Sequence, residues 1–89
     1  MFFNWDCRKA SANLKKHGIS FSEASEVFGD DLSSCVPDPD SSLGEARFLI
    51  FGTTLTGSAL VVSFTEDSEY VRIISARRMT VAERKAYER

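Results

Sequence analysis

The chain has 89 residues, of which 43% are hydrophobic and 27% charged, and its formal net charge is −2. These values predict one globular domain over residues 1–89 rather than a disordered chain. The small negative net charge excludes nucleic-acid binding by overall charge alone, and the lack of a leader-like or long apolar run predicts a cytoplasmic protein.

The N-terminal third predicts a short strand followed by two helices. The aromatic run at 2–5 is typical of a strand. Asp6 can cap a helix that extends to about residue 17, and Gly18 is the left-handed residue expected after its end. A capping box at 20–23 then begins a second helix. Its apolar residues recur at helical spacing and predict one buried face: Phe21, Ala24, Val27 and Phe28.

The rest of the chain predicts strands and a final helix. Residues 29–46 are rich in turn formers and predict a loop, with room for a short strand at 34–36. Three strand-like segments follow, joined by short polar turns that favour an antiparallel meander: 46–52, 58–65 and 69–76. A capping box at 80–83 opens a C-terminal helix. The order β-α-α-β-β-β-α predicts an α+β domain with an antiparallel sheet.

Two cysteines and one histidine leave little basis for a metal or disulfide framework. Cys7 and Cys35 could pair, but we expect two ordinary thiols. One histidine with scattered carboxylates has no ligand spacing. No metal and no cofactor are therefore expected.

Charge is strongly segregated along the chain. Residues 70–89 hold six basic side chains and two acidic ones, and residues 1–17 hold four basic and one acidic. Residues 18–69 hold one basic side chain, Arg47, and ten acidic ones. The two ends together predict a local basic surface.

The last strand carries the first candidate site. Strict alternation places Arg72 and Arg78 on one face of the strand and Arg77 on the other. Arg77 and Arg78, at the strand end and near a helix N-terminus, could hold a phosphodiester. The alternative is that both lie in solvent while Arg72 pairs with a carboxylate of the sheet.

A second candidate is the sequence LKKHG at 14–18. The His17 imidazole can accept or donate a proton near neutral pH, as general acid–base catalysis requires. The alternative is that Lys15, Lys16 and His17 complement the negative end of the helix dipole. The residues alone leave both interpretations open.

The motifs in combination resemble the BrnT family, the toxin half of bacterial type II toxin–antitoxin pairs. The resemblance is in register over nearly the whole chain. It rests on these stretches: FFNWD at 2–6, Lys9-Ala10, Asn13, KKHG at 15–18, FSEASEVF at 21–28, PDPD at 37–40, EAR at 45–47, LVV at 60–62, RIISARR at 72–78 and ER…Y at 83–87.

The resemblance implies a RelE-like fold and a metal-independent endoribonuclease that cleaves messenger RNA and inhibits translation. It implies a BrnA-type antitoxin with a ribbon-helix-helix part as partner, in a dimer of heterodimers that contacts operator DNA only through the antitoxin. The matching positions imply catalytic roles for Arg72, Arg77, His17 and Lys16. They imply RNA contacts by Lys15, Arg47, Arg78, Arg84 and Tyr87.

One stretch departs from the family pattern. Members commonly read T-E-R before the last strand, whereas this chain reads Thr65-Glu66-Asp67, with an acid where a base is expected near RNA. The departure motivates an alternative function, a module that has lost cleavage and keeps antitoxin binding and operon regulation.

Overall fold

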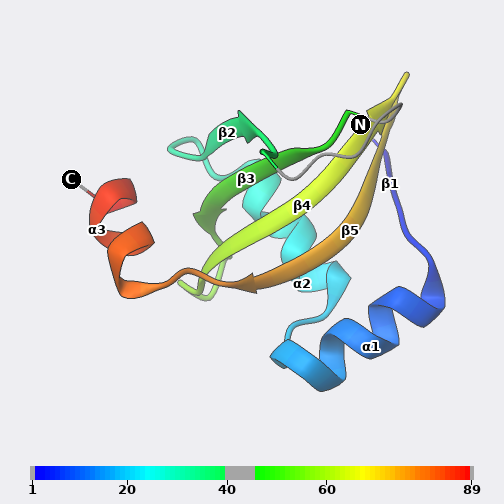
Figure 1. Ribbon diagram of the computed structural model, residues 1–89, viewed down its shortest axis with the longest axis horizontal. Helices are drawn as coiled ribbons and strands as arrows, with labels where there is room; N and C mark the ends of the chain where they lie inside the picture. Colours follow the sequence, from blue (N-terminus) through cyan, green and yellow to red (C-terminus); the bar gives the residue numbers. More distant parts are fainter. Residues whose placement is uncertain (1, 40–45, 89) are drawn as a thin grey trace.

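The computed structural model describes residues 2–39 and 46–88 and has an α+β architecture (Figure 1). Residues 40–45, in the C-terminal part of the expected loop, lie outside this part. The elements are β1 (Phe2–Asn4), α1 (Cys7–His17), α2 (Phe21–Ser25), the 3₁₀ helix η1 (Glu26–Gly29), β2 (Ser34–Pro37), β3 (Phe48–Thr53), β4 (Ala59–Asp67), β5 (Tyr70–Arg78) and α3 (Val81–Glu88).

A five-stranded sheet forms the centre of the molecule, in the order β1-β5-β4-β3-β2. The predicted meander of β3, β4 and β5 is antiparallel, and the short strand at 34–37 joins its edge as β2. The prediction of a wholly antiparallel sheet is wrong, because β1 pairs with β5 in parallel. Parallel pairing requires no local turn, so a three-residue strand gives no sequence signal for it.

The hydrophobic core lies between one face of the sheet and the helices α1 and α2. Core residues come from the two helical segments and from alternate positions of the strands: Ile19, Phe21, Ala24, Val27, Ile50, Leu60, Val62, Phe64, Val71, Ile73 and Ala76. Burial of each large side chain contributes roughly 1.5–3 kcal/mol. No helix in 2–39 or 46–88 is long and apolar enough to cross a membrane.

The predicted helix termini are confirmed. The Asp6 carboxylate accepts hydrogen bonds from the first turn of α1, and Gly18 ends that helix in the left-handed conformation with φ +72°. The Ser20 hydroxyl accepts from the Glu23 backbone at 3.0 Å and starts α2. These local signals place α1 and α2 correctly in the sequence.

A buried amide joins α1 to β5. The Asn13 Nδ2 atom donates to the carbonyls of Ile19 and Ala76 at 3.0 and 2.9 Å, and its Oδ1 atom accepts from the Ala76 backbone at 3.1 Å. Asn13 is 7% exposed, so these bonds are shielded from water. The side chain therefore fixes the C-terminal half of α1 against the end of β5.

A bulge in β5 changes which face its arginines occupy. Ser63 pairs with Ser75 and Phe64 with Ile73, so Ile74 has no partner in β4. The alternation shifts by one residue at that point. Arg72 and Arg77 therefore lie on the same face, away from α1 and α2, and Arg78 lies on the helix face. The predicted sharing of faces by Arg72 and Arg78 is wrong.

The remaining helix, α3, lies against the open face of the sheet. Its residues Glu83, Ala86 and Tyr87 border a hollow of about 480 Å³ with Val36 and Phe51. Phe51 points away from the core because the adjacent Ile50 is buried in it. Figure 1 shows α3 (red) well separated from α1 (blue).

Candidate functional site

The C-terminal end of β5 brings several predicted site residues together. The Arg78 Nη1 atom donates to the His17 carbonyl oxygen at 3.1 Å, so the end of α1 lies beside the end of the strand. Asn13 fixes the same contact from within the core. Lys16 precedes His17 on α1 and is exposed. Arg77, Arg78, Lys16 and His17 therefore surround one end of the sheet and are called the basic end below.

Arg77 forms a bidentate ion pair with Glu83 of α3. Its Nη1 and Nη2 atoms donate to the two carboxylate oxygens at 2.7 and 2.9 Å. The side chains of Arg77 and Glu83 are 41% and 26% exposed. Glu83 also accepts from the Thr80 backbone at 2.8 Å, and its own backbone donates to the Thr80 hydroxyl at 3.1 Å. The predicted capping box of α3 is therefore confirmed, and its acidic residue, Glu83, also forms the ion pair with Arg77.

The ion pair holds Glu83 in its charged form. Hydrogen bonds from Arg77 are the main cause that lowers the pKa of Glu83 to about 2, and the Thr80 backbone adds to the effect. The same hydrogen bonding raises the pKa of Arg77. Arg77 and Glu83 are therefore both ionised around neutral pH, and the planar guanidinium of Arg77 directs two N–H donors at the carboxylate of Glu83.

Tyr87 attaches the far end of α3 to the body of the protein. Its hydroxyl donates to the Asp30 Oδ2 atom, which also accepts from the backbone and hydroxyl of Thr53 at 2.8 and 3.1 Å. The bond from Tyr87 is the largest cause that lowers the pKa of Asp30 to about 2. The predicted ligand-binding residue Tyr87 thus holds α3 in place through a carboxylate in this structure.

Arg72 and Arg47 lie at the other end of the sheet. Arg72 pairs with Thr65, and its Nη1 atom donates to Asn4 at 3.4 Å. Arg47 precedes Phe48, whose partner Phe64 adjoins Thr65. Four residues, one of them in the bulge, lie between Arg72 and Arg77, a span of about 15 Å at strand spacing. The two arginines lie on the same face of the sheet but too far apart to contact the same phosphate.

Acidic residues surround Arg72. Glu66 and Asp67 line the same small hollow as Arg72, together with Asn4 and Tyr70. Both acids belong to β4, and the turn that follows is Ser68–Glu69, so the predicted start of the turn at residue 66 is wrong. Glu66 and Asp67 therefore reduce the positive charge around Arg72.

The other predicted contact residues occupy two helices. Lys15 is exposed on α1, beside Lys16, and Arg84 is exposed on α3, next to Glu83. The Lys15 side chain lines a shallow hollow with Cys7, Arg8, Ser11 and Ala12, towards the start of α1. Cys7 and Cys35 are exposed free thiols. No cluster of three metal-ligating side chains occurs in 2–39 or 46–88.

The sequence interpretation missed the residues that hold this site. Glu83 was assigned only to a helix cap, although an acid six residues after Arg77 can fold back on it. The structural roles of Asn13 and Asp30 were not visible in the sequence, because their partners are backbone groups and a tyrosine far away in the chain.

Comparison with known families identifies the chain. A family model described as "Ribonuclease toxin, BrnT, of type II toxin-antitoxin system" matches residues 5–83. The chain belongs to the BrnT family. That match spans the basic end, the bulged strand and Glu83, and it confirms the resemblance drawn from the motifs. The family is one of ribonuclease toxins, and membership in a type II system implies an antitoxin partner.

A solved structure shows the same fold. The 1.1 Å crystal structure of the Brucella abortus ribonuclease toxin BrnT has 23% sequence identity to this chain and a TM-score of 0.65. The match covers 90% of this chain and 99% of that one. The five-stranded mixed sheet with three helices is thus a BrnT fold. No curated protein matches the chain.

Proposed function

We propose that this BrnT-family chain is an endoribonuclease that cleaves messenger RNA, needs no metal and inhibits translation. The observation that supports it best is Arg77, a half-exposed guanidinium held in a bidentate pair with a carboxylate at the basic end. A guanidinium that binds a carboxylate with both arms has the geometry to bind a phosphate in the same way. The proposed fold assignment is RelE-like.

The basic end supplies the charge stabilisation that RNA cleavage requires. The ribose 2′-oxygen bonds to phosphorus, the bond to the 5′-oxygen breaks, and a 2′,3′-cyclic phosphate remains. The transition state concentrates negative charge on the phosphate oxygens, which Arg77 neutralises, and Lys16 is a further candidate for this role. The His17 imidazole takes the proton from the 2′-hydroxyl, and water protonates the leaving oxygen.

A phosphate that binds Arg77 through the same two nitrogen atoms must displace Glu83. Phosphate and carboxylate compete for the same two guanidinium nitrogen atoms. An exposed ion pair contributes about 1 kcal/mol or less, so a phosphate with further contacts can displace the carboxylate. Those contacts come from Lys15, Arg78 and Arg84. Arg72, Arg47 and Tyr87 have lesser roles, because acids surround Arg72 and Asp30 engages Tyr87.

We further propose a BrnA-type ribbon-helix-helix antitoxin as the partner. The pair assembles as a dimer of heterodimers in the cytoplasm and contacts operator DNA only through the antitoxin. Family membership in a type II system supports an antitoxin in general terms.

Replacement of Arg77 by Ala tests the function. We expect RNA cleavage to fall by about a hundredfold, the scale for loss of one charge-stabilising donor. The matched control is Arg8→Ala, which removes an exposed arginine at the far end of α1. Cleavage of an RNA oligonucleotide and a thermal melt are measured for both variants. An Arg77→Ala protein that is folded and fully active would refute the assignment.

A cleavage-deficient binding module is the second candidate. Glu66 and Asp67 beside Arg72 favour it, since they oppose phosphate binding at that end of the sheet. Overexpression separates the two functions. Growth arrest with loss of RNA supports the toxin, and healthy cells that retain antitoxin binding support the module.

A further inference from the structure

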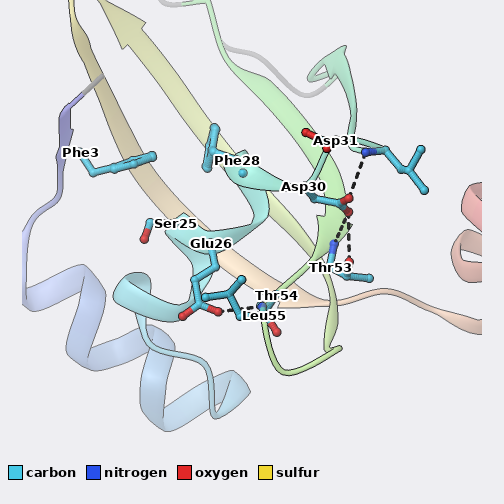
Figure 2. Close-up of a pocket in the computed structure, with 11 residues that line it drawn as sticks. Phe3, Ser25, Glu26, Phe28, Asp30, Asp31, Thr53, Thr54 and Leu55 are labelled. Carbon is cyan, nitrogen blue, oxygen red and sulfur yellow. Dashed lines mark hydrogen bonds between the residues drawn. The ribbon is translucent and has the colours of Figure 1, made fainter.

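A broad hollow beside α2 has an acidic rim. It measures about 850 Å³, and Phe3 and Phe28 contribute apolar surface to it. Figure 2 shows these two rings on one side of the hollow and Glu26, Thr54 and Leu55 on another. Asp30 and Asp31 complete the acidic part of its rim.

Two leucines of this rim project into solvent. Leu32 is 80% exposed and Leu55 is 88% exposed, the two highest values among the large apolar side chains in 2–39 and 46–88. Their backbones are anchored, because that of Leu55 donates to Glu26 at 3.0 Å and that of Leu32 donates to Asp30 at 3.0 Å. Exposed apolar side chains next to an open hollow are typical of a protein–protein contact.

The negative charge of the rim favours a basic polypeptide over a nucleic acid as the partner. Glu26, Asp30 and Asp31 would repel the backbone of a nucleic acid and attract lysine or arginine. An open hollow flanked by projecting leucines suits a polypeptide better than an enclosed small molecule. The complementary ligand is a polypeptide segment with large apolar side chains flanked by basic ones.

The hollow lies at the same end of the sheet as the candidate catalytic residues. Leu55 belongs to the turn between β3 and β4, and β4 then runs directly beside the end of β5. Leu60 pairs with Arg78, and Val61 pairs with Arg77. A polypeptide bound at the turn is therefore well placed to extend over the basic end and exclude RNA.

We propose that the acidic hollow is the docking surface for the antitoxin, which inserts apolar side chains between Leu32 and Leu55 and pairs basic ones with the rim. This inference rests on the proposed function for the presence of an antitoxin. It adds the place of docking, the chemistry of the segment and the steric reason why docking stops cleavage.

Calorimetric titration with the purified product of the gene immediately downstream, where we expect the antitoxin to be encoded, tests the surface. We expect Leu32→Asp and Leu55→Asp each to weaken binding at least tenfold, and Asp31→Lys to weaken it several-fold. Leu14→Asp, the same change at a half-exposed leucine of α1, should bind within twofold of the unaltered protein. Thermal melts confirm that each variant is folded.

The outcomes separate this inference from the function. Unaltered affinity in folded Leu32→Asp and Leu55→Asp proteins overturns the docking surface and leaves the partnership intact. Failure of the unaltered protein to bind overturns both the partnership and the surface, whereas RNA cleavage by the chain alone is measured separately. A homodimer of the chain alone that Leu55→Asp dissociates would assign the surface to a second copy and overturn the inference.

Discussion

The helices α1 and α3 are attached to the sheet in different ways. α1 is joined to β5 by the buried Asn13 amide, which makes three hydrogen bonds inside the protein. α3 is attached mainly through polar side chains at the surface, Glu83 on Arg77 and Tyr87 on Asp30. Buried bonds have no competitor, whereas water, salt or a ligand can replace surface bonds. α1 is therefore a fixed part of the fold, and α3 is a helix whose contacts can be exchanged.

The comparison also separates stability from activity. Residues that hold α1 have no free donors to offer a substrate. The residue that holds the first turn of α3 is Arg77, the leading catalytic candidate. Changes at the α1 contact should therefore alter folding, and changes at the α3 contact should alter RNA binding.

The largest expected effect is that of Asn13→Ala. Loss of the amide leaves the carbonyls of Ile19 and Ala76 and the Ala76 backbone N–H without their partner in the core. Each unsatisfied buried group costs about 1–3 kcal/mol, and partial access of water reduces the sum to roughly 3 kcal/mol. Urea denaturation measures the change, with the exposed Ser11→Ala as control on the same helix. A loss below about 1 kcal/mol would show that α1 is no better attached than α3.

The intermediate effect is expected for Glu83→Gln, which should change RNA binding more than stability. Glutamine keeps the capping box but removes the charge that competes for Arg77. RNA affinity should rise by roughly fivefold, equivalent to the upper value of about 1 kcal/mol for an exposed pair. Fluorescence anisotropy with a non-cleavable RNA measures it. The control is Glu69→Gln, which changes the net charge equally at an exposed position away from α3. Equal gains in both variants would attribute the effect to net charge.

The smallest expected effect is a pH dependence of stability. The folded-state pKa of Glu83, about 2, lies below its ordinary value of 4.5. Its contribution is therefore fully present above about pH 4.5 and is lost as the pH falls towards 2. Exposure of the pair limits the contribution to less than about 1 kcal/mol. Urea denaturation of the unaltered protein and Glu83→Gln between pH 2.5 and 7 should give a difference that shrinks only at the acidic end. A difference that changes between pH 6 and 8 would contradict the assignment.

Local rules predict most of the fold from the sequence. Asp6, Gly18, Ser20 and Thr80 mark the helix boundaries because their effects depend only on nearby backbone groups. Hydrophobic alternation likewise finds β3 and β4. The class of domain and the family motifs follow from these patterns.

Long-range effects are what the sequence does not show. The parallel pairing of β1 depends on β5 lying at the edge of the antiparallel meander, where its free side can accept another strand. The bulge at Ile74 depends on how Ser63 and Phe64 of β4 pair with β5. That single residue changes the face of Arg77 and so changes which candidates can act together. The separation of Arg72 from the basic end follows from the same strand geometry.

The bulge at Ile74 also divides β5 into two parts, in which the core-facing side chains fall on differently numbered positions. Residues before it, such as Val71 and Ile73, face the core on odd numbers, and Ala76 after it does so on an even number. If β5 kept all its residues but lost the bulge, Ser75 would turn inward and Arg77 would enter the apolar core, whereas deletion of Ile74 itself would restore regular alternation and leave both faces unchanged. A one-residue shift that the bulge does not absorb is therefore more disruptive than most substitutions in the strand, since it exchanges an entire set of side chains between the core and the surface.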